Sequence, residues 1–570
     1  MTDVTPLTLG IPGFSYADLY DPARLQDLSR CFDRQLAEEA PELFGEFERY
    51  RSTQGDGLKP EEVSDLLVRL APELGSFVAR LFGVEAEREA QAALIRGDFE
   101  TVFAFKNEIV AKSASRFKGE DATTWDLTEL SHRFNLLVEA VIDEERLRAD
   151  REASIAGFAI ALKRAMEDES FALIGPIRGR LMSDEKASLD FAEALAGDDA
   201  ALAGALNDLV GRWVFASTRD ESLKSAVAGW VSFKAPAKTD FASLVHHDKK
   251  TFDGIGVWTV AEGHHRRRDG FGLTDPRFPE RRVLYEVDHC IYCHDRDTDS
   301  CSKGMRNKKD GTYKVNPLGV TITGCPLEEK ISEMHFVKRQ GDNLGALALI
   351  TIDNPLCPGT GHRICNDCMK GCIYQKTEPV NIPQIETNVL TDVLFMPWGF
   401  EIYSLLTRWN PLNIKRPAAL PYNGRNVLVA GMGPAGYTLS HYLLNEGFGV
   451  VGIDGLKIEP LPGHLTGDAE NPPQPVRDFR DLYEALDQRI MLGFGGVAEY
   501  GITVRWDKNF LKVIYLNLLR RQNFRIYGGV RFGGTLTINE AWDLGFDHIA
   551  IASGAGKPTL IELKNNLIRG

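Results

Sequence analysis

Eight cysteines are gathered in one stretch of this 570-residue chain, which has nine cysteines in all. Thiolates bind zinc and iron-sulfur clusters, and paired thiols form disulfides, so a dense set of cysteines calls for one of these three chemistries. The eight are Cys290, Cys293, Cys301, Cys325, Cys357, Cys365, Cys368 and Cys372. Their number and spacing predict a metal or redox centre.

The start of the chain indicates the compartment of the protein, and the compartment decides which of these chemistries can persist. The sequence MTDVTPLTLG has neither the basic start nor the apolar core of an export signal. No uninterrupted apolar run approaches the roughly 18 residues of a membrane-spanning helix. We therefore expect a cytoplasmic protein without a membrane span, in which close-set cysteines are metal ligands more often than disulfides.

The net charge limits the partners. A formal charge of -15 argues against broad binding to nucleic acid or to anionic membranes, although a local basic patch can escape that average. One basic patch lies just before the first cysteine; it is either a solvated loop or a docking site for an acidic partner or a phosphate. It comprises His264, His265, Arg266, Arg267, Arg268, Arg277, Arg281 and Arg282.

Three metal chemistries compete for the cysteines. Zinc could use the Cys-x2-Cys pairs at Cys290 and Cys365. Cys290-Ile-Tyr-Cys293-His294 also matches the attachment pattern of a c-type haem, which would leave the other cysteines unexplained. Two-cluster ferredoxins place a proline after a ligand cysteine, as Cys325 and Cys357 do here. Iron-sulfur ligation accounts for all eight, and a turn at residues 309–312 lets the gap before Cys325 loop out.

A dinucleotide-binding pattern follows the cysteines. Residues 426–430 form an apolar strand, a helical run covers residues 437–446, and a second strand at residues 450–453 ends at Asp454. The connecting turn consists of Gly431, Met432, Gly433, Pro434, Ala435 and Gly436. Its glycines allow backbone N–H groups to approach a pyrophosphate, and Asp454 can accept a hydrogen bond from a ribose hydroxyl. The pattern alone does not separate FAD from NAD(P)H.

Several of these motifs resemble the glutamate synthase small subunit, whose N-terminal domain is shared with dihydropyrimidine dehydrogenase. The similarity covers about residues 285–565. The motifs in the cysteine region are Cys325-Pro326-Leu327-Glu328-Glu329-Lys330-Ile331, Asn354-Pro355-Leu356-Cys357-Pro358, Cys368-x3-Cys372 and Glu378-Pro379-Val380-Asn381-Ile382 with Glu386. The resemblance implies a helical domain that holds two 4Fe-4S clusters with interleaved ligands.

The resemblance also implies a distribution of the ligands. Cys290, Cys293 and Cys301 would bind one cluster, with Glu386 as the fourth ligand. The other would be bound by Cys325, Cys357, Cys368 and Cys372. Cys365 is an additional thiol that could replace Cys368 or displace Glu386.

Further motifs resemble the FAD site of the same family. They are Gly495-Gly496, Tyr500-Gly501 and a strand at residues 549–553 that runs into Gly554-Ala555. In that family an NAD(P)H domain follows this strand. The chain ends at Gly570 without a second glycine-rich fingerprint, so we expect the nicotinamide domain to come from the remainder of a longer chain or from another chain, and FAD binding by these residues alone to be poor.

The elements that must position these residues predict three domains. Residues 1–240 read as an all-α domain of unreadable role, with Asp21-Pro22 at a helix start and Leu25 on its apolar face. Residues 241–408 form the α-helical, ferredoxin-like two-cluster domain. Residues 409–570 form a partial α/β Rossmann-type FAD domain. Linkers are expected at 234–285 and 409–424.

The predicted function is that of an oxidoreductase subunit or fragment. Electrons would pass from NAD(P)H through FAD and two 4Fe-4S clusters to an acceptor that the sequence does not identify. No catalytic nucleophile, acid or base is predicted. The alternatives are a non-catalytic electron-relay or docking module and a zinc-stapled interaction protein. The expected partner is a redox protein or the rest of a longer chain.

Overall fold

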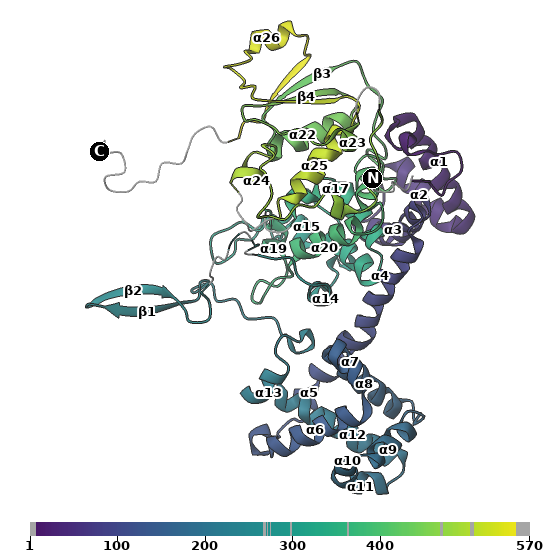
Figure 1. Cartoon of the computed structure of the whole chain (residues 1–570), viewed down its shortest axis with the longest axis vertical. Helices are drawn as coiled ribbons and strands as arrows, with labels where there is room; N and C mark the ends of the chain where they lie inside the picture. Colours follow the sequence, from purple (N-terminus) through teal and green to yellow (C-terminus); the bar gives the residue numbers. More distant parts are fainter. Residues whose placement is uncertain are drawn as a thin grey trace.

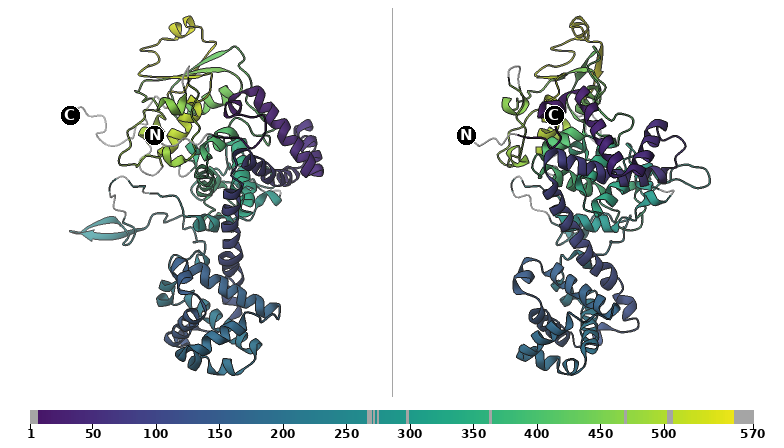
Figure 2. Two further views of the ribbon diagram at one scale, coloured as in Figure 1. Left: turned by 45° about the vertical axis from the view of Figure 1, so that its right-hand side comes forward. Right: turned by 90° about the vertical axis from the view of Figure 1, so that its right-hand side faces the viewer.

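The computed structural model covers most of the chain. It describes residues 7–265, 270, 272–273, 275–296, 299–361, 364–467, 471–501 and 507–554. Figures 1 and 2 show an elongated molecule with a large body at one end, a helical domain at the other and a two-stranded arm that projects sideways. The cysteines and the glycine-rich turn both belong to the body.

The first helices belong to the body. The side chain of Asp21 accepts a hydrogen bond from Ala23 N and so caps the first of them, as its sequence predicts. Its predicted apolar face, including Leu25 and Phe32, is buried. The helices are α1 (Pro22–Glu39), α2 (Pro41–Thr53), α3 (Pro60–Phe82) and α4 (Glu85–Asp98). Helix α3 packs against two helices of the cysteine region, α16 (Ile331–Arg339) and α17 (Asn343–Asp353), so the first helices support the thiol-bearing part.

The distal domain has its own core. Helix α4 continues through two π-helical segments, Phe99–Phe103 and Lys106–Val110, and leads from the body into this domain (Figure 1). Its helices are α5 (Ser113–Arg116), α6 (Leu127–Val141), α7 (Glu144–Ala149), α8 (Arg151–Glu167), α9 (Ile174–Ser183), α10 (Glu185–Asp190), α11 (Ala192–Ala196), α12 (Asp199–Ser217) and α13 (Glu221–Ala226). The predicted single domain 1–240 is therefore divided between two hydrophobic cores.

The arm occupies part of the predicted linker 234–285. Strands β1 (His247–Phe252) and β2 (Ile255–Val260) pair in antiparallel register. Asp253 and Gly254 between them both have positive φ, which is the geometry of a two-residue hairpin turn. The Asp-Gly pair between two strand-like runs was the sequence signal that could have predicted this hairpin.

The cysteine region is built from helices, most of them short. They are α14 (Glu280–His289), α15 (Ser300–Lys303), α16, α17, α18 (Cys357–Thr360), α19 (Asp367–Gly371), α20 (Ile382–Leu394) and α21 (Gly399–Leu406). The turn predicted at residues 309–312 is confirmed, because Asn307 N donates to Thr312 O between bridged neighbours. The core of this region is continuous with that of α1–α3 and of the following α/β part.

The last part of the chain contains a four-stranded parallel sheet. Its strands are β3 (Asn426–Ala430), β4 (Gly449–Asp454), β5 (Phe524–Gly528) and β6 (His548–Ile551), in the order β5-β4-β3-β6. Helices α22 (Pro434–Asn445) and α25 (Asn509–Leu519) lie between the sheet and the cysteine region, whereas α26 (Ile538–Asp543) lies on the far side (Figure 1). Two short helices, α23 (Gly463–Thr466) and α24 (Val497–Tyr500), lie in the connections.

At the level of architecture, the chain is multidomain and mostly helical, with an all-helical N-terminal region, as its sequence predicts. Within the described ranges, none of the helices combines the length and the apolar composition needed to cross a bilayer.

Candidate functional site

The first group of thiols joins cysteines from both ends of the cysteine region. Cys290 follows α14, and Cys293 begins a short 3-10 helix. Of the two residues between them, Tyr292 has a left-handed φ of 52°, which bends the chain between the two thiols. Cys290 interacts electrostatically with Cys293 and with Cys372. Cys301 also interacts with Cys290 and Cys372, so Cys290, Cys293, Cys301 and Cys372 form the first thiol group.

A close backbone contact brings Cys372 to this group. A Cβ atom on Gly371 would lie 2.6 Å from Ser300 O and 3.4 Å from Cys301 Cα. Only glycine allows α19 to approach α15 this closely. The backbone of Cys325 joins the same contact, because its N–H donates to Cys301 O at 2.8 Å.

The second group contains the remaining thiols and the carboxyl group of Glu386, and Glu329 lies beside it. Cys357 and Cys325 each interact electrostatically with Glu386 and Glu329. Cys368 interacts with these two carboxyl groups and with Cys325 and Cys365. We call Cys325, Cys357, Cys365, Cys368 and Glu386 the second group.

Glu386 is held in place by an amide. Asn354 Nδ2 donates to Glu386 Oε1 at 2.8 Å and to Thr360 Oγ1 at 2.6 Å. Burial raises the pKa of Glu386 well above its usual range, and the nearby Glu329 raises it further. A buried carboxyl group beside thiols stays neutral unless a cation compensates its charge.

The two groups differ from the distribution implied by the resemblance. That distribution joined Glu386 to Cys290, Cys293 and Cys301, and Cys372 to the other cysteines. In the structure Cys372 belongs with Cys290, and Glu386 belongs with Cys357. The physical reason is the contact between α19 and α15, which spacing along the chain does not reveal.

Burial dominates the chemistry of the thiols. It raises the pKa of Cys290 to about 12, that of Cys293 to about 11 and that of Cys325 to about 12. It also raises the pKa of Cys301, Cys357 and Cys368 well above the usual range of a thiol. Such thiols ionise only when a bound metal supplies positive charge.

Backbone N–H groups point at several of the sulfur atoms. Tyr292 N lies 3.5 Å from Cys290 Sγ. The Cys325 sulfur accepts from Leu327 and Glu329, and the Cys372 sulfur accepts from Tyr374 and Val380. Hydrogen bonds of this kind stabilise thiolates and tune the potential of a cluster bound to them.

Among the described residues, which include all eight cysteines, no three His, Cys, Asp or Glu side chains are arranged to hold a metal ion. A tetrathiolate zinc site needs four sulfur atoms at about 2.3 Å from one point. The arrangement of the thiols by itself favours neither zinc nor an iron-sulfur cluster.

The predicted glycine-rich turn lies between β3 and α22. Gly431 has a φ of 104°, and a Cβ atom there would lie 2.4 Å from Ala552 O. A Cβ atom on Gly436 would lie 1.8 Å from Gly431 O, so this glycine is required for the fold itself. Gly433, in contrast, has no atom within 3.4 Å of such a Cβ atom. The backbone at Gly433 and at Pro434 and Ala435, the first helical residues, is therefore accessible to a ligand at the start of a twelve-residue helix.

The predicted Gly495-Gly496 pair packs on this turn. Gly495 N donates to Met432 O at 3.1 Å. A Cβ atom on Gly496 would lie 2.9 Å from Gly433 Cα. Two segments more than sixty residues apart thus form one glycine-lined cradle, which fits the phosphate-binding part of a dinucleotide.

The other predicted nucleotide residues lie around this cradle. Asp454, at the end of β4, accepts from Met432 N through Oδ2 and from Leu456 N through Oδ1, each at 3.0 Å. Tyr500 interacts electrostatically with Asp454, and Gly501 follows it at the end of α24. Gly554 has a positive φ just after β6, and Ala555 lies outside the described residues.

The short helix that begins at Cys357 packs against the α/β part of the chain. A Cβ atom on Gly359, two residues after Cys357, would lie 2.6 Å from the hydroxyl oxygen of Tyr437. Tyr437 is in the first turn of α22, immediately after the glycine-rich turn. Cys357 and Tyr437 both interact with the buried Tyr403. Sequence reasoning missed Gly359 and Tyr437, because neither belongs to a motif.

The chain thus joins a helical, cysteine-rich region to an α/β part with a four-stranded parallel sheet. Sequence comparisons place this chain near proteins without an assigned activity. The family described as RP005 N-terminal alpha-helical domain matches residues 9–83, which include α1 to α3.

Two proteins of Rickettsia prowazekii (strain Madrid E) are similar to parts of the chain. Uncharacterized protein RP006 is 53% identical over 211 residues, which cover 37% of this chain and 29% of RP006. Uncharacterized protein RP005 is 25% identical over 297 residues, which cover 49% of this chain and 82% of RP005. The chain thus spans less than a third of RP006 and most of RP005.

Proposed function

We propose that this chain is the flavin- and iron-sulfur-binding part of an NAD(P)H-dependent oxidoreductase that resembles the glutamate synthase small subunit. The observation that carries the proposal is the packing of Gly359 against Tyr437. This contact joins the segment that bears Cys357 to the helix that follows the glycine-rich turn. Such packing would bring the two proposed cofactor sites close to each other, and electron transfer between cofactors requires proximity.

The two thiol groups supply the ligands. Cys290, Cys293, Cys301 and Cys372 would hold one 4Fe-4S cluster. Cys325, Cys357 and Cys368 with Glu386 would hold the other, and Cys365 remains a neighbouring thiol. A bound cluster would exchange single electrons. The surrounding side chains exclude water, and the backbone N–H groups that donate to the sulfur atoms would tune the potential.

The nucleotide part supplies the second cofactor site. The strand order β5-β4-β3-β6 with parallel pairing is that of the dinucleotide-binding folds, which bind their ligand at the carboxyl ends of the strands. Gly433 leaves room for a pyrophosphate, and Asp454 holds the turn through Met432. FAD is the cofactor that the resemblance favours. A reducing cytoplasm is the compartment in which free thiols and such clusters persist.

Metal analysis tests the proposal. The chain is purified without oxygen and assayed for iron, acid-labile sulfide, zinc and haem, with visible and EPR spectra. We expect about eight iron atoms and eight sulfides per chain. A colourless preparation with stoichiometric zinc would replace the proposal with a zinc-stapled interaction protein. If the protein holds clusters but shows not even weak FAD binding in an equilibrium titration, the proposed function is reduced to that of an electron-relay module.

A further inference from the structure

A cavity of about 950 Å³ lies at the junction of the distal domain and the body. It is lined by the second π-helical segment, by the end of α12, by residues 227–236 and by Arg282 of α14. We call it the interdomain cavity. Its volume is in the range of small-molecule sites, which occur preferentially between domains.

The charged side chains that line the interdomain cavity are all cationic. Lys106, Lys224, Lys234 and Arg282 line the cavity, and no carboxylate belongs to its lining among the described residues. Their acidic partners stand behind or outside it, as with Glu221, whose side chain is 87% exposed. The chain as a whole has a net charge of -15, so this concentration of cations is a local feature.

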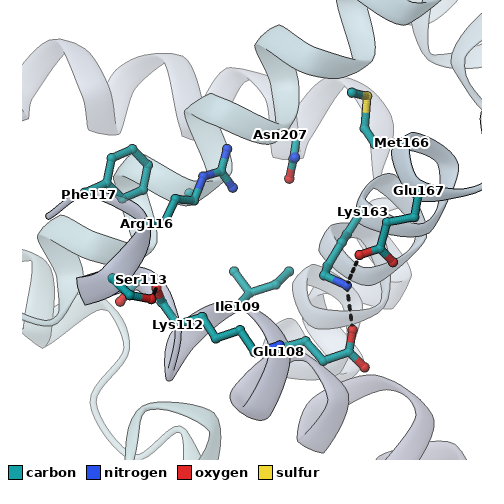
Figure 3. A pocket seen from close by; sticks show the side chains of 12 residues that line it. Glu108, Ile109, Lys112, Ser113, Arg116, Phe117, Lys163, Met166, Glu167 and Asn207 are labelled. Carbon is teal, nitrogen blue, oxygen red and sulfur yellow. Dashed lines mark hydrogen bonds and ion pairs between the residues drawn. The ribbon is translucent and has the colours of Figure 1, made fainter.

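A second cavity provides the contrast. The other side of the same π-helical segment lines a cavity of about 420 Å³ in the distal domain (Figure 3). There Lys163 donates to Glu108 at 2.9 Å and to Glu167 at 2.6 Å, and both carboxylates belong to the lining. There the carboxylates that pair with the lysine belong to the lining, whereas Asp288, Glu378 and Glu286, which pair with Lys106, Lys234 and Arg282, do not line the interdomain cavity.

The interdomain cavity also offers aromatic surface and an unused polar group. Trp230 and Phe233 belong to its lining, with ring centroids 6.0 Å apart. Ser217 lines it as well; its side chain is buried, and its hydroxyl has no hydrogen-bond partner in the structure. A buried hydroxyl without a partner is costly, and a ligand that accepts or donates a hydrogen bond there would remove the cost.

Stacked rings connect this cavity to the first thiol group. The cationic groups of Lys106, Lys234 and Arg282 lie 4.7–5.1 Å from the ring centroid of Tyr285. The ring of Tyr285 stacks with His289, which stacks with Tyr374 at 4.1 Å. Tyr374 interacts with Cys372 and Cys290. The cavity therefore lies at the end of a continuous contact path from those thiols.

We propose that the interdomain cavity binds a small, flat aromatic anion. The cations recognise its carboxylate, sulfonate or phosphate group, and Trp230 and Phe233 contact its ring. We further assign this ligand as the electron acceptor, and this assignment rests on the proposed function. Its ring would be a quinone, which becomes a hydroquinone by taking up two electrons and two protons from water. A cluster held by Cys290 and Cys372 would supply these electrons one at a time.

Binding of anthraquinone sulfonate to the full chain tests the site. We expect saturable binding that quenches tryptophan fluorescence, and quenching at least halved in Trp230→Phe. Lys224→Glu should weaken binding about tenfold, since reversing one charge near the ligand costs on the order of 1–2 kcal/mol. Lys224 is suited to this test because it is partly exposed and pairs only with the exposed Glu221 among the described residues.

The controls separate this site from general charge effects. Lys186→Glu makes the same change at an exposed position of the distal domain outside the lining, and should leave binding unchanged. An uncharged anthraquinone should bind at least about tenfold more weakly than the sulfonate. Equal weakening by both lysine variants, equal binding of the uncharged ring, or no saturable binding would overturn the proposal.

A redox experiment tests the assignment as acceptor. Chemically reduced protein is mixed with anthraquinone sulfonate under argon at a probe concentration below its Kd, and reoxidation is followed by absorbance. Lys224→Glu should slow reoxidation about tenfold, in parallel with its weaker binding. If the binding results are as expected but Lys224→Glu leaves the reoxidation rate unchanged, the acceptor assignment alone is overturned. A chain without clusters that still binds the probe would overturn the proposed function and leave the binding site standing.

Discussion

Gly359 and Tyr437 are packed so closely that a methyl group on the first would lie 2.6 Å from the hydroxyl oxygen of the second. This relationship joins α18, which begins at Cys357, to α22, which follows the glycine-rich turn. Ile514 of α25 closes the same contact at 3.1 Å. The contact leaves no room for any side chain larger than hydrogen.

The first prediction concerns this contact. Gly359→Ala should lower the free energy of unfolding by about 1–3 kcal/mol, because the tyrosine ring is buried and cannot move away. Tyr437→Phe removes the hydroxyl and should recover part of that loss in the double variant. Chemical denaturation measures all four proteins of the cycle. Gly204→Ala, in a helix with open space around the glycine, is the control and should stabilise the protein slightly. Additive effects of the two substitutions would show that the contact is not tight.

The second prediction separates cofactor binding from folding within one turn. Gly433→Ala should change the free energy of unfolding by less than about 1 kcal/mol, because its methyl group meets no atom within 3.4 Å. It should weaken FAD binding at least about tenfold, since the methyl group occupies the place of the pyrophosphate. Gly436→Ala should instead destabilise the fold by several kcal/mol, because of the 1.8 Å approach to Gly431 O. Thermal denaturation and FAD titration distinguish the two, and unchanged FAD affinity in Gly433→Ala would argue against a dinucleotide at this turn.

The third prediction concerns the distribution of the ligands. Cys290→Ala and Cys372→Ala should remove the same EPR signal, and Cys357→Ala should remove the other, because the structure places Cys372 with Cys290. Each substitution should lower the iron content from about eight to about four atoms per chain. Cys365→Ala is the matched control and should keep both signals. If Cys372→Ala and Cys357→Ala each remove the same EPR signal, the distribution of ligands implied by the resemblance is restored.

The fourth prediction concerns acid stability. Burial, together with the nearby Arg521 and Arg408, lowers the pKa of His441 to about 3. In the unfolded chain a histidine titrates near 6.5. Between these values the unfolded state binds the additional proton, so stability is full above about pH 6.5 and falls as the pH decreases toward 3.

The expected size of this effect is about 2 kcal/mol between pH 6.5 and 4.5. His441→Leu should remove the contribution of His441 to the pH dependence of the free energy of unfolding, which urea denaturation at each pH measures. His132→Leu is the control, because the His132 side chain is 52% exposed, and it should retain the pH dependence of the wild type. An unchanged slope in His441→Leu would show that this histidine is protonated in the folded protein.

The local elements were largely predictable because their signals are local. Asp21-Pro22 marks the start of α1, and the turn at residues 309–312 follows from Asp310-Gly311. The strand predicted at residues 426–430 matches β3. In each case the hydrogen bonds or apolar spacing that fix the element lie within a few residues of one another.

Contacts between distant segments decided how these elements are assembled. Composition and spacing alone determined that eight thiols share one region and that a glycine-rich turn follows it. Which thiols meet was decided by Gly371 against Cys301, and the junction with the nucleotide fold by Gly359 against Tyr437. The interdomain cavity likewise exists only because α12, residues 227–236 and Arg282 converge. A glycine that permits a close approach between distant helices has no signature along the chain, because the atom it avoids belongs to a residue far away in sequence.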